Sequence, residues 1–192
     1  MRKREPRVPG PGSEIIELEN FEVCRQETDH TCGPCAVRMI LKYLGRDIDE
    51  KKIAALCLTH PLGTLHWTLL AGFRKLLKPL GFSVEMSEND PDIYSCIKNG
   101  LRNGRPVMFI YGVIDDFHPP KKVTHYGIVT GVDEPAGEIM IANPFGRLER
   151  MPIGEWWGRF FLHDDYLPPV EGFFMRFGIL KPGTAFILKP AG

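Results

Sequence analysis

Apolar residues in the first half of the chain recur with the period of amphipathic helices. Between residues 33 and 44 they return every three or four positions, Pro34 falls in the first turn, and Gly45 follows as a stop signal. The same pattern predicts three more helices and one short strand. The helices are expected over residues 49–58, 64–77 and 91–101, and the strand over residues 82–86.

In the second half the pattern changes to short apolar runs separated by turn residues, which is typical of strands. Strands are expected over residues 106–113, 124–132 and 138–143, and a final hairpin over residues 173–180 and 184–188. Helices that precede strands, without steady alternation, favour an α+β fold over a doubly wound parallel sheet. The aromatic residues Trp156, Trp157, Phe160 and Phe161 are expected in the core.

The length of 192 residues suits one domain, which is expected to span residues 13–192. Residues 1–12 are basic and then rich in Pro and Gly, so they are expected to form a flexible tail. Lys and Arg total 24 and are balanced by 24 Asp and Glu. Phosphate binding needs an excess of cations, so nucleic acid is not expected as a partner.

No apolar stretch reaches the length of a membrane span, and neither a secretory signal nor a long inhibitory segment is visible before Gln26. The five cysteines are an odd number, which argues against a fully paired secreted framework. The sequence therefore predicts a cytoplasmic protein that has at least one free thiol and no contact with a membrane.

The candidate chemistry centres on Cys32, at the start of the first predicted helix. Unpaired backbone N–H groups at a helix start favour a thiolate nucleophile. His125, at the start of one predicted strand, and Asn143, at the end of the next, each lie nine positions from Glu134. An antiparallel hairpin brings such residues together, so His125 would act as the base and Asn143 would fix its tautomer. Gln26 and the Cys32 N–H group would hold an oxyanion.

Three other interpretations of these residues stay open. Cys32-Gly-Pro-Cys35 has the letters of a thioredoxin dithiol, although the polar segment before it is unlike the buried strand that precedes such a motif. Cys32, Cys35, Cys57 and His60 have spacings that structural zinc admits. In the third interpretation these side chains are only structural. Cys35 is either a small residue facing the core or a partner that traps Cys32 in a disulfide.

The sequence resembles the papain-like cysteine peptidases, and most closely the branch of double-glycine leader peptidases. The resemblance covers about residues 20–157. It rests on Gln26-x5-Cys32-Gly-x-x-Ala36, Met39 to Gly45, Gly63-Thr64, Leu80-Gly-Phe82, Gly104 to Val107, His125-Tyr-Gly-Ile-Val and Asn143-Pro144. One departure is Asn143, where the double-glycine branch commonly has Asp and papain has Asn.

The resemblance implies a papain-like fold, in which a helical lobe that carries Cys32 packs on an antiparallel sheet that carries His125 and Asn143. It also implies a thiol hydrolase, and in particular a cysteine peptidase that acts on a peptide or protein through Cys32, His125, Asn143 and Gln26. No metal and no other cofactor is expected. The alternatives are an acyltransferase or amidase with the same triad, and an inactive module of the same fold that binds peptides.

Overall fold

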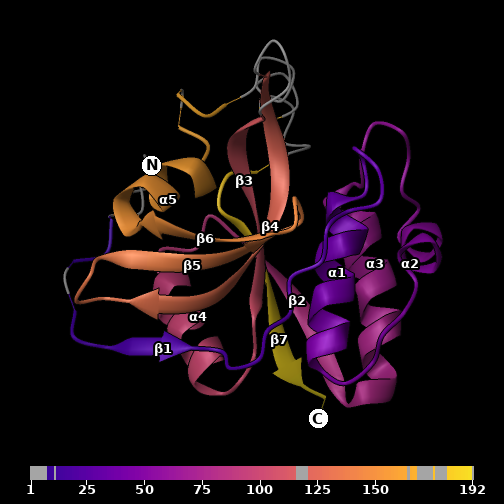
Figure 1. Ribbon diagram of the computed structural model, residues 1–192, viewed down its shortest axis with the longest axis horizontal. Coiled ribbons are helices and arrows are strands. Elements are labelled where there is room, and N and C mark those ends of the chain that lie inside the picture. The colour runs from indigo at the N-terminus through magenta and orange to yellow at the C-terminus, as the bar shows by residue number, and fades with distance from the viewer. Residues whose placement is uncertain are drawn as a thin grey trace, which may run out of the picture.

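The computed structural model is built on one antiparallel sheet with helices on both faces (Figure 1). It describes residues 8–10, 12–115, 121–163, 165–167, 175 and 181–191. Most of the predicted tail, residues 116–120 of the polar segment before His125, and most of residues 173–180 lie outside the described residues. The predicted α+β fold, in which helices that include the one with Cys32 pack on an antiparallel sheet with His125 and Asn143, is confirmed.

The sheet has the strand order β2-β7-β3-β4-β5-β6, and β1 pairs with residues 131–133 of β4 on the edge opposite to β5. The strands are β1 (Ile15–Glu17), β2 (Phe82–Glu88), β3 (Val107–Asp115), β4 (Lys121–Asp133), β5 (Glu138–Asn143), β6 (Arg147–Pro152) and β7 (Thr184–Pro190). Strand β7 lies between β2 and β3, which are far earlier in the chain.

The helices are α1 (Cys32–Tyr43), α2 (Glu50–Leu56), α3 (His66–Leu77), α4 (Ile93–Arg102) and α5 (Ile153–Phe160), and a 3-10 turn, η1 (Lys78–Leu80), follows α3. Figure 1 shows α1, α2 and α3 together on one side of the sheet, and α4 and α5 on the other. Each side encloses its own apolar cluster. The predicted helices are therefore found, with ends that differ from expectation by one or two residues.

The cluster on the α5 face is dominated by aromatic side chains. Trp156 stacks on Phe160 with 5.0 Å between ring centroids, and Phe109 of β3 meets both rings edge-on. Trp157 and Phe161 are also buried. The expectation that these aromatic residues pack in the core is confirmed, and they cover the sheet face onto which His125 and Asn143 project.

Three elements were not expected from the sequence: β1, β6 and α5. Strand β6 is mostly exposed along its length, so it lacks the apolar alternation that marks a strand. The strand expected over residues 184–188 is found as β7, and β2 and β3 pair with the two edges of its residues 185–187. The other half of the predicted hairpin lies outside the described residues apart from residue 175. The connection between the strands expected over residues 106–113 and 124–132 is also shorter than those bounds imply, because β3 continues to Asp115 and β4 begins at Lys121.

The connection between α2 and α3 presents apolar side chains to solvent. Leu58, Leu62 and Leu65 of the connection are exposed, as is Trp67 in the first turn of α3, and Leu58 has a positive φ of 52°. The connection is tied to the sheet because the Tyr126 hydroxyl donates a hydrogen bond to the Thr64 carbonyl at 2.9 Å. It therefore forms a fixed apolar rim beside β4.

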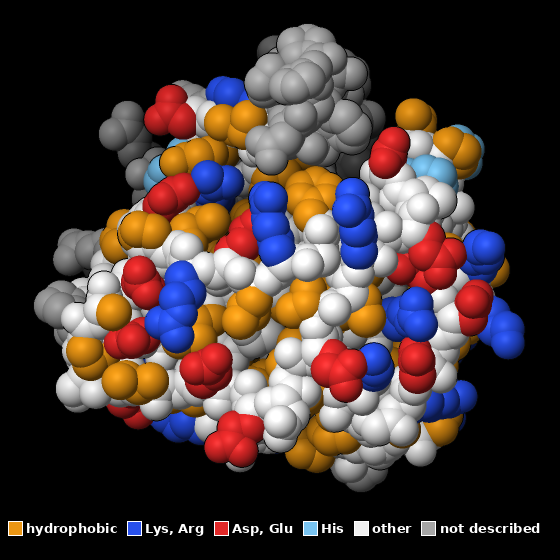
Figure 2. All heavy atoms as spheres, viewed as in Figure 1, with side chains coloured by type: hydrophobic (Ala, Val, Ile, Leu, Met, Phe, Trp, Pro, Cys, Tyr) orange, Lys and Arg blue, Asp and Glu red, His pale blue; other side chains and the backbone are white. Residues whose placement is uncertain are grey.

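Charge is spread evenly over the face of the molecule drawn in Figure 2, where acidic and basic side chains alternate without a region of one sign. This distribution agrees with the formal net charge of zero. Among the described residues, none of the helices combines the length and the apolar character needed to cross a bilayer.

Candidate active site

His125 and Asn143 meet at the open end of the β4–β5 hairpin. The His125 Nε2 atom lies 2.9 Å from Asn143 Oδ1, and both side chains are buried. Asp133 pairs with Glu138, and the register slips by one residue between Val129 and Gly131. If the pairing of Val129 with Ile141 is continued past the end of β5, His125 lies opposite residue 145. Asn143, two residues earlier, is then the diagonal neighbour of His125. The predicted proximity is found, although the centre of the turn is not at Glu134.

The Asn143 amide is held at both ends. Its Oδ1 atom accepts a hydrogen bond from the Phe145 backbone N–H at 2.9 Å, and its Nδ2 atom donates to Glu149 Oε1 at 2.9 Å. A backbone N–H can only donate and a carboxylate can only accept, so these two contacts fix the orientation of the amide. His125 must then donate through Nε2–H, and its Nδ1 atom keeps a lone pair that can accept a proton.

Aromatic rings hold the imidazole on both sides. The Phe145 ring stacks on His125 with 4.3 Å between centroids, and the Tyr111 ring lies 6.0 Å away on the facing strand β3. Gly127, two residues beyond His125, leaves the space that these rings need: a Cβ atom there would lie 2.9 Å from Tyr111 Cε1. The imidazole therefore has little freedom to rotate away from Asn143.

Gln26 reaches the same region through its backbone. Its N–H group donates to the Pro144 carbonyl at 2.7 Å, and the preceding Arg25 forms an isolated bridge with Phe145. The side-chain Nε2 atom donates one hydrogen to the Thr28 carbonyl at 2.8 Å. A primary amide has a second N–H, so this contact leaves one hydrogen for another acceptor.

Cys32 is the first residue of α1 and lies against β4. The cap residue Thr31 makes no side-chain cap hydrogen bond, and the first turn contains no acidic residue. Gly33 packs closely on both α3 and β4, because a Cβ atom there would lie 2.8 Å from Leu69 Cδ1 and 3.2 Å from the Tyr126 ring. The Tyr126 N–H group lies near the thiol and favours its thiolate form. The chain neighbour of His125 is therefore in contact with the predicted nucleophile.

Burial keeps both titratable groups neutral in the free protein. The pKa of the Cys32 thiol is raised because its sulfur is desolvated, an effect that the N–H groups of Tyr126 and Gly33 only partly offset. The pKa of His125 is lowered to about 4, chiefly by burial, although its hydrogen bond with Asn143 acts in the opposite direction. The resting pair is therefore thiol and imidazole rather than thiolate and imidazolium.

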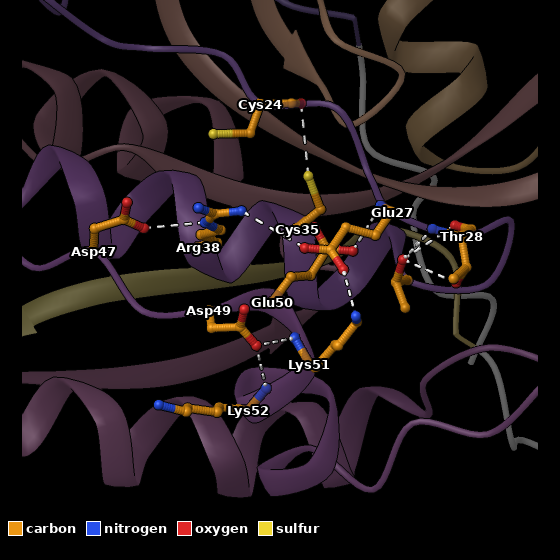
Figure 3. A network of polar contacts seen from close by, with 11 residues as sticks. Cys24, Glu27, Thr28, Cys35, Arg38, Asp47, Asp49, Glu50, Lys51 and Lys52 are labelled. Carbon is orange, nitrogen blue, oxygen red and sulfur yellow. Dashed lines mark hydrogen bonds and ion pairs between the residues drawn. The ribbon is translucent and has the colours of Figure 1, made fainter.

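Glu50 is a buried carboxyl group that sequence reasoning overlooked. It lies at the start of α2, is 0% exposed, and its Oε1 atom accepts a hydrogen bond from the Glu27 N–H group at 2.9 Å. Figure 3 shows it within a network that also contains Cys35 and Glu27. Its charge raises the pKa of Cys32. Apolar periodicity around Ile53 predicted the helix, but it gave no sign of a buried acid at its start.

Cys35 faces the core, as one of the two interpretations of it held. Its side chain is 0% exposed, and its thiol donates to the Cys24 carbonyl at 3.6 Å, as Figure 3 shows. The segment before α1 contains only an isolated bridge, so the strand that precedes a thioredoxin motif is missing there. In the part of the chain that the structure describes, no three His, Cys, Asp or Glu side chains are arranged to hold a metal. The spacing of Cys32, Cys35, Cys57 and His60 therefore does not become a zinc site.

Comparison with known proteins identifies a family and a fold that this chain matches. Residues 20–153 match the Peptidase C39 family. Two uncharacterized proteins, from Methanothermobacter marburgensis and Methanothermobacter thermautotrophicus, are each 26% identical to this chain. The alignments cover 70% and 71% of this chain, and 83% and 77% of those proteins.

Two solved structures share the fold at low sequence identity. The peptidase domain of Streptococcus ComA, a bifunctional ABC transporter of a quorum-sensing pathway, has a TM-score of 0.60 and 17% identity, with 89% of this chain and 99% of that chain covered. A double-glycine-motif protease of an AMS/PCAT transporter, solved with its leader peptide, has a TM-score of 0.55 and 16% identity, with 92% and 99% covered. At such identities the likeness concerns the fold alone.

Proposed function

Because the chain belongs to the peptidase C39 family, we propose that it is a cysteine peptidase that cleaves a peptide bond through a thioester on Cys32. The observation that carries the proposal is the hydrogen bond of 2.9 Å between His125 Nε2 and Asn143 Oδ1. The residue after His125 is Tyr126, whose backbone N–H lies near the Cys32 thiol. We assign the catalytic domain to residues 13–192.

In the first step His125 acts as a general base. As the Cys32 sulfur attacks the scissile carbonyl carbon, its proton moves to the Nδ1 atom, which the Asn143 contact leaves unprotonated. The tetrahedral intermediate then expels the amine, which takes the proton from the imidazolium. The products of this step are a free amino terminus and a thioester.

In the second step the thioester is hydrolysed. His125 Nδ1 removes a proton from water as the water oxygen attacks the thioester carbon, and the imidazolium returns this proton to the departing sulfur. The products are a carboxylic acid, which ionises in water, and the free Cys32 thiol. Asn143 keeps Nε2–H engaged throughout, so the imidazole stays in the tautomer whose Nδ1 lone pair can accept a proton.

Gln26 and the uncapped start of α1 supply the oxyanion hole. The second Nε2 hydrogen of Gln26 and the backbone N–H of Cys32 are the two donors that we assign to the negative oxygen. Removal of one such donor typically lowers kcat by about a hundredfold to a thousandfold. Gln26→Ala is therefore expected to lower kcat with little change in KM.

The substrate that we propose is a peptide or a protein segment. The solved neighbour that holds a leader peptide supports this class of ligand. All five cysteines are free, and a catalytic thiol needs reducing surroundings, so we assign the protein to the cytoplasm. No metal or cofactor takes part in the proposed steps.

The test is cleavage of a complex peptide mixture by the full chain under reducing conditions, with new peptide termini detected by mass spectrometry. Wild type and Cys96→Ser are expected to produce the same cleavages, and Cys32→Ser none. Cys96 is a matched control because it is a second partly exposed free thiol, on α4.

Three results would overturn the peptidase assignment. Cleavage that survives in Cys32→Ser would exclude this nucleophile. Peptides that are joined to added amines rather than hydrolysed would indicate an acyltransferase. Peptides that are retained without cleavage, together with alkylation of Cys32 by iodoacetamide that is indifferent to His125→Ala, would indicate a binding module.

A further inference from the structure

Glu149 lies behind the proposed triad, on the strand that follows Asn143. Its Oε1 atom accepts the hydrogen bond from Asn143 Nδ2 at 2.9 Å, and its side chain is only 20% exposed. In the β5–β6 hairpin Asn143 pairs with Arg147 and Ile141 pairs with Glu149. Residues two apart on a strand share a face, so Glu149 and Arg147 project to the same side as Asn143.

We propose that Glu149 is a positioning residue for the reaction, which acts through Asn143 to fix the tautomer of His125 and to stabilise its imidazolium form. This inference rests on the proposed function, since it concerns the same triad. Asn143 carries no charge of its own. The negative charge that an aspartate would supply directly comes instead from Glu149, one hydrogen bond further away from the imidazole.

The hydrogen-bond polarity supports this role. With its Nδ2 atom bound to a carboxylate, the amide must turn Oδ1 toward His125, where a cation on the ring strengthens the contact. Without Glu149, the Phe145 N–H group alone would hold the amide. Asn143 would then be freer to rotate and to present a donor to Nε2, which selects the wrong tautomer of the base.

Arg147 opposes Glu149. Its Nε atom donates to the same Glu149 oxygen that Asn143 uses, and its positive charge lowers the pKa of His125. The two side chains are therefore expected to shift His125 in opposite directions: loss of Glu149 disfavours the imidazolium, and loss of the Arg147 charge favours it.

Among the described residues, few other ionisable groups lie near His125, Asn143 and Glu149. Besides the two side chains of β6, Tyr111 of β3 lies beside the His125 ring. Two further charged or titratable groups, Cys32 of α1 and Arg159 of α5, act on Tyr111. Arg159 is paired with Glu155 in its own helix at 2.7 Å. Glu149 is therefore the acidic side chain that the described residues place behind Asn143.

The experiment compares Glu149→Gln, Glu149→Ala and Arg147→Gln with the control Glu138→Gln. Glu138 is an acid of the same hairpin that pairs with Arg150 at 3.5 Å, away from Asn143. The readouts are the tautomer and the pKa of His125, measured by NMR of ring nitrogens labelled with 15N, and the pH dependence of Cys32 alkylation by iodoacetamide.

Glu149→Gln is expected to keep the Nε2–H tautomer, because its side-chain oxygen still accepts from Asn143, and to lower the pKa of His125. Glu149→Ala is expected to mix the two tautomers and to slow alkylation of Cys32 by about tenfold or more. Arg147→Gln is expected to raise the pKa of His125, and the control to leave it unchanged.

The proposal would be overturned if Glu149→Gln and Glu149→Ala both left the tautomer and the pKa of His125 as they are in Glu138→Gln. It would equally be overturned if Arg147→Gln and Glu149→Gln shifted that pKa in the same direction. Near-ultraviolet circular dichroism establishes that each variant is folded, and Glu149→Gln serves if the alanine variant is not. The NMR readout needs no turnover, so it separates failure of this inference from failure of the proposed peptidase activity.

Discussion

The Glu50 carboxylate at the start of α2 accepts a hydrogen bond from the backbone N–H of Glu27 at 2.9 Å, in the segment between Gln26 and Cys32. A buried acid thus holds the loop that leads into the nucleophile, although its charge disfavours the thiolate. The two effects are separable, because an amide keeps the acceptor for Glu27 and removes the charge.

Glu50→Gln is therefore expected to make Cys32 easier to ionise. The midpoint of iodoacetamide labelling against pH should move down, because the negative charge of Glu50 raises the pKa of Cys32. Glu50→Ala should instead cost about 1–3 kcal/mol in the free energy of unfolding, since the Glu27 N–H loses its acceptor. Asp47→Asn, at an exposed carboxylate paired with Arg38, is the control that should leave the midpoint in place.

The free energy of unfolding is expected to fall as the pH drops from 6.5 toward 4, because His125 is buried in its neutral form. The pKa of this buried imidazole is about 4 in the folded protein and 6.5 in the unfolded chain. Between these values the unfolded chain binds more protons, so the contribution is fully present above pH 6.5 and is lost toward pH 4. The loss is at most about 3 kcal/mol, and urea unfolding at several pH values measures it.

His125→Gln should flatten this pH dependence without abolishing it, because burial also lowers the pKa of His66. The carboxyl group of Glu14 contributes in a separate window. The Arg102 and Lys98 contacts lower its pKa from 4.5 to about 2, so its contribution is lost only below pH 4.5. A wild-type profile that stays level between pH 6.5 and 4 would contradict the burial of a neutral His125.

Gly33→Ala is expected to disturb the nucleophile more than the fold. The new Cβ atom would lie 2.8 Å from Leu69 Cδ1 and 3.2 Å from the Tyr126 ring, so the Leu69 methyl must turn aside and the start of α1 or the Tyr126 ring must shift slightly. Alkylation of Cys32 should slow by about ten- to a hundredfold, because small displacements of a reacting group are costly. Gly154→Ala in α5 has nothing within 4 Å of its Cβ position and should leave labelling unchanged.

Glu134→Ala is expected to release the segment before β1. The Glu134 carboxylate accepts hydrogen bonds from the Glu14 N–H at 3.0 Å, from Lys98 at 2.8 Å and from the Tyr94 hydroxyl at 3.3 Å. Loss of these contacts should cost about 2 kcal/mol or more in the free energy of unfolding and make the chain around the exposed residue Ser13 easier for proteases to cleave. The same change at Glu138, an acid at the other end of the same turn, should cost much less because its one ion pair is exposed.

Much of the fold could be predicted because the spacing of apolar residues along the chain indicates which face of each helix is buried. The helices around Ile40, Ile53, Phe73 and Ile97 each bury one apolar stripe, and such stripes are visible in the sequence. Strand β6 could not be predicted because only Met151 is buried along it. The eight-residue helix α5 is too short to show a clear period.

The contact between His125 and Asn143 could be predicted despite an incorrect turn centre. The observed register moves the position opposite His125 from 143 to 145, a shift of two residues. Because side chains alternate with a period of two, this shift leaves Asn143 on the same face. Glu149 and Glu50 could not be predicted, since one follows a turn in an unrecognised strand and the other is a charged residue in a position that usually faces solvent.

The position of β7 has a consequence for how the protein acquires its site. β7 is the sheet partner of β2, and it also pairs with β3, which lies next to the strand of His125. Phe186 of β7 packs near Tyr126, whose amide faces Cys32. A nascent chain that has not yet exposed residues 184–190 can form helices, but it cannot complete the sheet. The sheet that supports Cys32 and His125 is therefore completed only by contacts between distant parts of the chain, which are slow to form.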